Sequence, residues 1–241
     1  MRFKELFRKI WLELLDNKSY VKYLRKHGVR VGENVLFRYP SHTNIDFTRP
    51  CLIEFGSDID VNDNFTILTH DFGSFVFRNL YKDFVNSSGK VRIGNNIVFG
   101  RNVTVLKGVT IGDNCVIGLG SVVTNSIPSN SVVAGCPARV ICSIEDYYKK
   151  RKEKSKKEAI EYGVELARVI GGVDKLKIDS FPEEWVQFLS LEEYELNPSI
   201  RPIVDMRLKE KVNINEFLER PRPFQSFTEF RNALNKEFDN E

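Results

Sequence analysis

The stretch VRIGNNIVFGRNVTVLKGVTIGDNCVIGLGSVVT, residues 91–124, decides the fold because an apolar residue recurs in it at every sixth position. Small or apolar residues also stand two positions before each of these. The two sets are Ile93, Phe99, Val105, Ile111, Ile117 and Val123, and Val91, Ile97, Val103, Val109, Cys115 and Ser121. A spacing of two is the period of a β-strand, whereas a helix would need a period near 3.6. Recurrence at six therefore predicts a parallel coil of short strands and corners, stacked about 4.7–4.9 Å apart.

Glycine follows several of the inward positions, and we interpret Gly94 and Gly112 as corner residues that use the permissive backbone dihedrals of glycine. The buried companion position Cys115 is expected to behave as a small hydrophobic residue, since the four cysteines form no CxxC pair.

Two irregularities interrupt the repeat on its N-terminal side. The coil is predicted to begin near Val31, to become irregular over residues 37–52, and to resume at Phe55. It then stops at His70, and residues 71–90 are rich in aromatic side chains but lack the six-residue spacing. An insertion of this length in a regular coil costs closure entropy and is usually functional.

Composition and charge limit the remaining possibilities. The chain has 241 residues, 41% hydrophobic and 29% charged, with a net charge of +3, which does not call for a nucleic acid as a partner. An uninterrupted apolar run long enough to span a membrane and the apolar core of a signal peptide are both lacking, so we expect a cytoplasmic protein. We predict an N-terminal helical segment over 1–27, the coil over 28–142 and a helical, charged appendage over 143–241.

The N-terminal segment allows two interpretations. Apolar residues from Phe3 to Leu15 fall on one helical face beside Lys4, Arg8 and Lys9, the pattern of a helix that lies on a membrane surface. A helix that covers the end of the coil or contacts another subunit would show the same pattern, because coil ends expose unpaired strand edges. A second short helix is expected from Ser19 to His27.

His70 is the first candidate for chemistry, because it is one of three histidines and stands where the repeat breaks into the inserted loop. A rigid coil presents such a side chain accurately, and imidazole accepts a proton near neutral pH. We therefore interpret His70 as a general base.

The run from Val91 to Ile141, ending in GCPARVI, closely resembles the hexapeptide-repeat acyltransferases, whose fold is a left-handed parallel β-helix. The resemblance covers about residues 28–142, and the segments NIDFTRP, ILTHDF and SSG are most similar to the subgroup that acts in bacterial capsule and lipopolysaccharide assembly. It implies a homotrimer that uses acetyl-CoA and no metal. The expected acceptor is a saccharide or glycolipid precursor.

The resemblance also implies roles for matching positions. His70 would deprotonate the acceptor as it attacks the thioester, and the backbone N–H of Arg101, after Gly100, would hold the oxyanion. Acceptor contacts are expected from Asn44, Asp46, Asp71 and Arg78, the last within an aromatic wall formed by the inserted loop. The coenzyme would lie between adjacent subunits, along Gly118, Leu119, Gly120, Thr124 and Arg139.

Other roles for these residues stay open. Asn44 and Asp46 would equally satisfy backbone groups in a turn, and Arg49 would equally pair with Asp46. For Asp71 we favour a cap on the loop over orientation of the imidazole, because adjacent residues in a strand point to opposite faces. The loop aromatics would equally pack on a neighbouring subunit. Val98, Leu119 and Asn125 depart from the tryptophan, alanine and lysine that are common in the family, and a bulkier Leu119 would narrow the coenzyme groove.

The function that this pattern favours is O-acetyl transfer, with N-acetyl transfer to an amino sugar as the alternative. A non-catalytic trimeric scaffold is the alternative from another class, and the departures at Val98 and Leu119 are what favour it. A zinc enzyme on the same coil, of the γ-type carbonic anhydrase class, is disfavoured because His27, His42 and His70 show no ligand pattern.

Overall fold

The computed structural model describes residues 12, 14–208 and 211–238 of the chain. It divides into two compact units, Met1–Tyr148 and Lys149–Glu241, which we describe separately.

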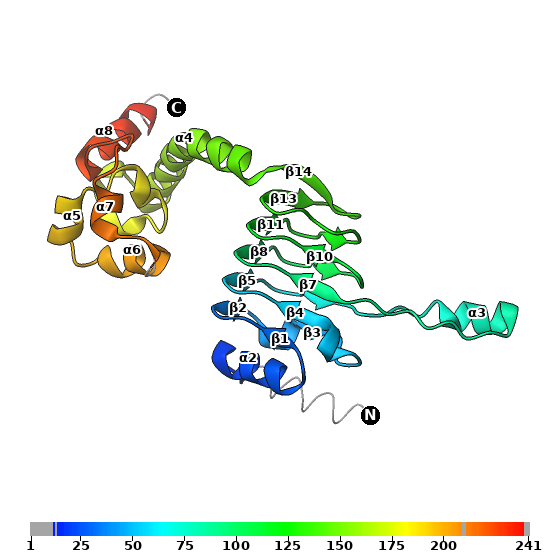
Figure 1. Ribbon diagram of the computed structural model, residues 1–241. Helices are drawn as coiled ribbons and strands as arrows, with labels where there is room; N and C mark the ends of the chain where they lie inside the picture. The colour runs from blue at the N-terminus through cyan, green and yellow to red at the C-terminus, as the bar shows by residue number, and fades with distance from the viewer. Residues whose placement is uncertain (1–11, 13, 209–210, 239–241) are drawn as a thin grey trace. The chain divides into compact units, whose positions relative to one another are not determined.

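The first unit is a coil of three sheets whose strands follow one another around the turns (Figure 1). The first sheet holds β1 (Arg30–Val31), β4 (Ile53–Phe55), β7 (Val91–Ile93) and β10 (Thr110–Ile111). The second holds β2 (Val35–Phe37), β5 (Ile59–Val61), β8 (Ile97–Phe99), β11 (Cys115–Ile117), β13 (Ser131–Ala134) and β14 (Arg139–Ser143). The third holds β3 (Asn44–Ile45), β6 (Thr66–Ile67), β9 (Thr104–Val105) and β12 (Val122–Val123).

These strands pair in parallel except at the end of the coil, where β14 runs antiparallel to β13. In the register of β5 and β8, Ile59 lies opposite Ile97 and Val61 opposite Phe99, so the six-residue spacing places like residues above one another. These inward side chains are buried, as is Cys115. The short parallel strands predicted from the spacing are therefore confirmed.

The corners of the coil depend on two different properties of their residues. We call the turns after the strands of the first, second and third sheets the first, second and third corners. At the first corner, positive φ values fall on Asn34, Asn96 and Asn114 rather than on glycine, and the Asn96 amide donates to Asn114 Oδ1 at 2.9 Å. The predicted reason for Gly94 was therefore wrong. A Cβ atom there would stand 2.5 Å from Asp113 Oδ1 and 2.9 Å from the Gly112 carbonyl carbon, so Gly94 is required by close stacking of the turns.

The expectation that Gly112 uses the permissive backbone dihedrals of glycine was wrong for the same reason. A Cβ atom on Gly112 would stand 2.5 Å from the backbone nitrogen of Ser129 on the next turn. A short polar side chain such as asparagine tolerates positive φ, which leaves glycine for the positions where backbones nearly touch.

Helices accompany the coil at two places in the first unit. Helix α2 (Asn17–Lys26) matches the predicted second helix, and Asp16 caps it by accepting from the Ser19 N–H at 2.7 Å. The first predicted helix, with its basic face between residues 3 and 15, lies almost wholly outside the described residues. Two short 3-10 helices, η1 (Pro40–His42) and η2 (Pro50–Leu52), occupy the irregular segment at the second and third corners of the first turn.

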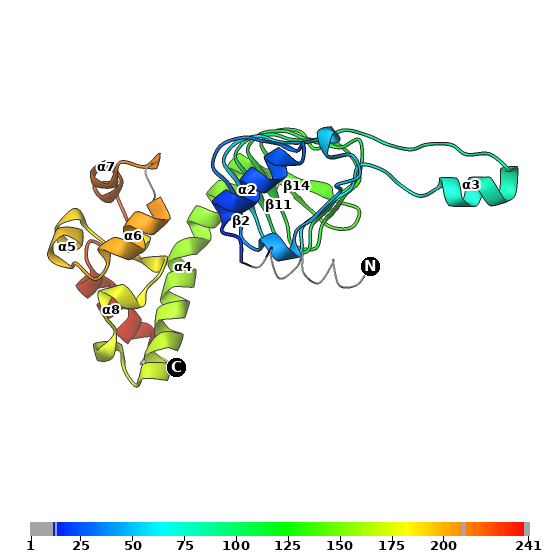
Figure 2. The same ribbon diagram turned by 90° about the horizontal axis from the view of Figure 1, so that it is seen from below.

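The insertion 71–90 is an arm that carries a helix, α3 (Ser74–Tyr81), which the sequence did not predict. Figure 2 shows the coil with its strands stacked and the arm leaving one corner, with α3 at its far end.

The second unit is helical. After α4 (Ile144–Ile170), which begins in the first unit, its elements are η3 (Val173–Lys175), η4 (Ile178–Ser180), η5 (Glu184–Gln187), α5 (Leu191–Leu196), α6 (Arg201–Leu208), α7 (Ile214–Leu218) and α8 (Phe227–Phe238). Its own core forms around Phe181, Trp185, Phe188 and Phe230. The Ser226 hydroxyl accepts from the Glu229 N–H at 3.2 Å at the start of α8, as the capping-box spacing predicts. Among the described residues, no helix is long and apolar enough to cross a membrane.

Candidate active site

His70 lies at the third corner, directly beyond β6 and at the root of the arm. Its backbone forms an isolated antiparallel bridge with Ser88, which fixes the residue where the arm leaves and returns. The side chain is 13% exposed, so it is held by its surroundings but still reaches solvent.

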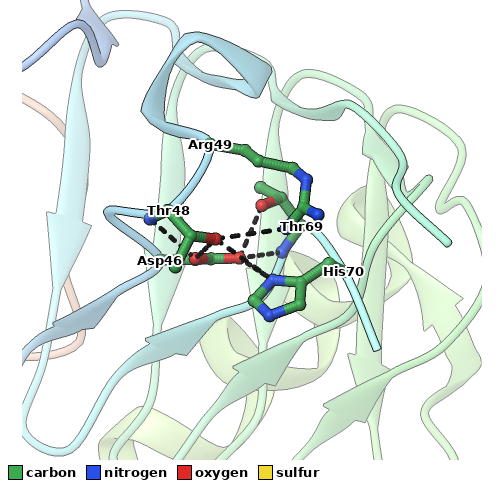
Figure 3. Close-up of polar contacts among 5 residues, drawn as sticks. All are labelled: Asp46, Thr48, Arg49, Thr69 and His70. Atoms are coloured by element: carbon green, nitrogen blue, oxygen red, sulfur yellow. Dashed lines mark hydrogen bonds and ion pairs between the residues drawn. The ribbon is translucent and has the colours of Figure 1, made fainter. Parts of the chain in front are cut away.

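The buried carboxylate of Asp46 holds the imidazole (Figure 3). Asp46 follows β3, which pairs with β6, and this register brings the two residues to the same corner. Asp46 Oδ2 accepts from His70 Nδ1 at 2.6 Å, from the Thr69 hydroxyl at 2.5 Å and from the Thr69 N–H at 3.0 Å. Asp46 Oδ1 accepts from the Thr48 hydroxyl at 2.5 Å and from the Thr48 N–H at 3.0 Å.

These contacts decide the charge of Asp46. Burial acts to raise its pKa, but the hydrogen bonds from Thr48, Thr69 and His70 outweigh burial, and the pKa lies well below its ordinary value. Asp46 is therefore a carboxylate at neutral pH and only accepts hydrogen bonds.

The tautomer of His70 follows from that charge. Because Nδ1 faces a carboxylate oxygen, the ring proton of neutral His70 resides on Nδ1. Figure 3 shows the other ring nitrogen directed away from Asp46. Its lone pair is therefore free of the carboxylate, which is the arrangement that a general base requires.

Thr48 and Thr69 are the parts of this network that sequence reasoning missed. Each gives Asp46 both a hydroxyl and a backbone donor. The available signal was their position, one immediately before His70 and the other two residues after Asp46. Arg49 does not pair with Asp46 here, and instead donates to the Thr48 hydroxyl at 3.3 Å.

Asp71 fastens the root of the arm. Its carboxylate accepts from the Gly73 N–H at 3.0 Å and from the Ser87 hydroxyl at 2.8 Å, and it pairs with Lys107 on the adjacent turn. The Lys107 ammonium is the largest of the influences that hold the pKa of Asp71 below its ordinary value. The structure therefore gives Asp71 the capping role. Beside it, the exposed ring of Phe72 lies with its centroid 4.9 Å from that of His70.

The other predicted acceptor residues lie apart from this network. Asn44 is exposed on β3, in register with Thr66, and does not contact His70 in the described structure. Arg78 lies on α3, where its guanidinium stands 5.5 Å from the centroid of the Phe75 ring.

The predicted oxyanion and coenzyme residues gather at a different corner. Gly100, Arg101, Gly118, Leu119 and Gly120 all lie at the second corner, so the third sheet separates them from His70. Two contacts show how closely this corner stacks: the Gly120 N–H donates to the Arg101 carbonyl at 2.8 Å, and a Cβ atom on Gly100 would stand 2.6 Å from the Leu119 nitrogen. One chain therefore does not bring the two halves of the predicted site together.

The remaining predicted coenzyme residues, Thr124 and Arg139, lie near the C-terminal end of the coil. Thr124 lies at the third corner like His70, directly after β12, and its hydroxyl donates to Asn125 Oδ1 at 2.8 Å. Arg139 begins β14 and donates to the Ala138 carbonyl at 2.9 Å. Leu119, the bulky residue in the predicted groove, is 69% exposed.

A second histidine and aspartate pair lies at the second corner. His42 Nδ1 stands 2.7 Å from Asp63 Oδ1, and about half of the His42 side chain is exposed. Unlike Asp46, the Asp63 carboxylate accepts no hydrogen bond from a hydroxyl of the described residues. In the described part of the chain, no group of three or more histidine, cysteine or acidic side chains is placed to hold a metal ion.

Comparisons with known proteins bear on the first unit. The family model described as bacterial transferase hexapeptide (six repeats) matches residues 90–125. Protein CapG of Staphylococcus aureus is 36% identical over 148 residues, which cover 61% of this chain and 85% of CapG. The galactoside O-acetyltransferase of Escherichia coli strain K12 is 36% identical over 133 residues, which cover 53% of this chain and 63% of that enzyme. The chain thus spans less than two thirds of the galactoside enzyme.

Among solved structures, a galactoside acetyltransferase in complex with coenzyme A is 28% identical, with a TM-score of 0.42. That match covers 61% of this chain and 82% of the solved chain.

Proposed function

The chain belongs to the bacterial hexapeptide-repeat acyltransferases, and from that premise we propose that it transfers an acetyl group from acetyl-CoA to a hydroxyl of a saccharide or glycolipid precursor. The observation that supports this proposal most is the pair formed by His70 and Asp46, at 2.6 Å. The Asp46 carboxylate accepts five hydrogen bonds, which fix its position, and it in turn orients the imidazole. General base catalysis uses an imidazole held in this way.

In the proposed reaction, His70 Nε2 takes the proton of the acceptor hydroxyl while the oxygen attacks the thioester carbonyl carbon. The carbon–sulfur bond then breaks, and the thiolate of coenzyme A leaves and takes the proton from His70 Nε2. Asp46 keeps Nδ1 protonated and stabilises the imidazolium that forms between the two steps. No acyl-enzyme is required.

The developing oxyanion is assigned to the backbone N–H of Arg101, a donor of a kind that is commonly worth about 3–4 kcal/mol. Because Arg101 and His70 lie at different corners of one coil, the proposal requires a homotrimer in which the third corner of one copy faces the second corner of the next. We also propose that the coil is left-handed, as the family resemblance implies, and that Gly118, Leu119, Gly120, Thr124 and Arg139 border the coenzyme.

The acceptor class rests on the relatives and on the site. The galactoside O-acetyltransferase acts, by its name, on a sugar hydroxyl. Phe72, exposed beside His70, offers an aromatic face of the kind that sugars stack on. An amine acceptor would use the same base, so N-acetyl transfer remains the alternative.

The experiment that tests the proposal measures thiol release from acetyl-CoA in the presence of hydroxyl sugars and, separately, amino sugars. Turnover with hydroxyl acceptors supports O-acetyl transfer, and turnover confined to amino sugars replaces it with N-acetyl transfer. Absence of turnover with every acceptor, together with absence of coenzyme binding by calorimetry, would contradict the proposal and favour a scaffold.

A further inference from the structure

A guanidinium lies close to the imidazole of the candidate active site. The half-buried side chain of Arg49 reaches across the network around Asp46 (Figure 3). Its Nη1 donates to Thr48 Oγ1 at 3.3 Å, and His70 Nδ1 lies 3.4 Å from the same oxygen. Arg49 therefore places a permanent positive charge next to the group that takes up a proton.

This charge is not balanced by a carboxylate of the described residues. Asp46 is three positions away, but its two oxygens accept from Thr48, Thr69 and His70 and not from Arg49. A guanidinium has five N–H donors, and Thr48 takes one of them. The others are available to a ligand.

The proposed trimer does not supply the missing carboxylate, because the second corner of the next copy has its acidic residues paired. Asp63 at that corner faces His42 at 2.7 Å. Asp60, on the strand before it, pairs with Arg38 at 2.6 Å. The same corner adds an exposed side chain, Arg101, which forms no ion pair within the described part of the chain. Two arginines, one from each copy, would thus border the site.

We propose that Arg49 binds an anionic group of the acceptor, a carboxylate or a phosphate, so that the acceptor is an acidic saccharide. This inference rests on the proposed function. An unbalanced guanidinium opposes the positive charge that His70 gains during the reaction, whereas a guanidinium neutralised by an anion of the acceptor does not. The planar fork of arginine matches a carboxylate or a phosphate with two parallel hydrogen bonds.

The coenzyme is not the source of this anion. The thioester that the acceptor attacks is neutral, and the phosphates of coenzyme A lie at the opposite end of the pantetheine arm. The group that Arg49 binds must therefore belong to the acceptor.

The test is calorimetry of the full-length protein, saturated with coenzyme A, with methyl glucoside, methyl glucuronide and glucose 6-phosphate. The last two carry a carboxylate and a phosphate at the same position of the sugar. At least one of them should bind tenfold or more tightly than methyl glucoside, since a charge-assisted pair is worth about a factor of ten or more. The probe that does so identifies the anion. Wild-type protein that binds neither more tightly would overturn the proposal.

Substitutions of Arg49 locate the preference. Arg49→Ala should weaken the preferred anionic probe by about tenfold or more and change methyl glucoside by less than about twofold. Arg49→Lys should keep part of the preference, because it keeps the charge but not the fork. The matched control is Arg92→Ala, since Arg92 is 56% exposed on β7 in the first sheet, and it should bind like the wild type.

Sedimentation velocity and circular dichroism complete the design. Arg49→Ala should keep the wild-type mass and spectrum. An Arg49→Ala variant that retains the preference would overturn the proposal, and one that dissociates would show instead that Arg49 pairs with a neighbouring copy. Because binding is measured without turnover, His70→Ala should keep the preference, so a failure of this inference and a failure of the catalytic proposal are distinguishable.

Discussion

Replacing Asp46 with asparagine would test whether the carboxylate sets the tautomer of His70. Both oxygens of Asp46 accept hydrogen bonds, one from His70 and Thr69 and the other from Thr48. An amide has a single oxygen, so its NH₂ group must face one of these two sets of donors.

Either orientation of the amide is unfavourable. Turned toward His70, the NH₂ group donates to Nδ1, which moves the ring proton to Nε2 and removes the base. Turned toward Thr48, it leaves the Thr48 backbone N–H without its acceptor, and the neutral amide oxygen that then faces His70 no longer stabilises the imidazolium as the carboxylate does. The first orientation also leaves the buried Thr69 N–H without its acceptor, at a cost of about 1–3 kcal/mol, and both orientations weaken catalysis. We therefore expect Asp46→Asn to lower kcat by about 10²–10⁴, the usual worth of a general base, or about 3–5 kcal/mol in activation free energy.

The assay is thiol release from acetyl-CoA with a hydroxyl sugar at saturation, with circular dichroism to verify the fold. Asp63→Asn is the matched control, because Asp63 pairs with His42 at the same kind of distance, 2.7 Å, at the other corner. It should retain wild-type kcat. A folded Asp46→Asn enzyme with kcat near the wild-type value would refute the reasoning.

Three further predictions concern stability. The folded pKa of Asp46 is depressed below the ordinary value of about 3.9, so its contribution to stability is present above pH 4 and is lost as the pH falls below it. Denaturant titrations between pH 5 and 2 should therefore show that the free energy of unfolding falls less steeply with pH for Asp46→Asn than for the wild type. Phe99, fully buried with its ring centroid 4.9 Å from that of Phe65, should cost about 3–5 kcal/mol when changed to alanine, measured by urea unfolding, and a cost below 1 kcal/mol would contradict the packing. Gly100→Ala should destabilise the coil by about 1–3 kcal/mol, because its Cβ atom would stand 2.6 Å from the Leu119 nitrogen and the turns would have to separate; an unchanged Tm would show that they are not so closely stacked.

The coil could be predicted from the sequence because its signal is local and repeats. Each inward residue, such as Ile93 or Phe99, is followed six positions later by another, and burial of both confirms the pattern. The family assignment is confirmed for the same reason, since the motif that carries it is a continuous stretch. The handedness of the coil stays a prediction.

The pairing of Asp46 with His70 could not be predicted from spacing, because the irregular segment around η2 hides the register that brings them together. The position of Arg101 could have been predicted by counting the six-residue strands that follow the arm. That count places Arg101 at the second corner, between a strand of the second sheet and a strand of the third, and so away from His70. Helix α3 escaped prediction because Phe75, Val76 and Phe77 are consecutive apolar residues, which hides the helical spacing in an element of eight residues.

The measurement that tests the central claim most directly compares acetyl transfer by His70→Ala and His42→Ala. Each removes a histidine whose Nδ1 contacts an aspartate, at 2.6 Å and 2.7 Å respectively, so the two changes differ mainly in position. If His70 is the general base, His70→Ala lowers kcat by about 10²–10⁴ with an unchanged circular dichroism spectrum, while His42→Ala keeps wild-type kcat. Retained activity in folded His70→Ala, or an equal loss in both variants, would contradict the account.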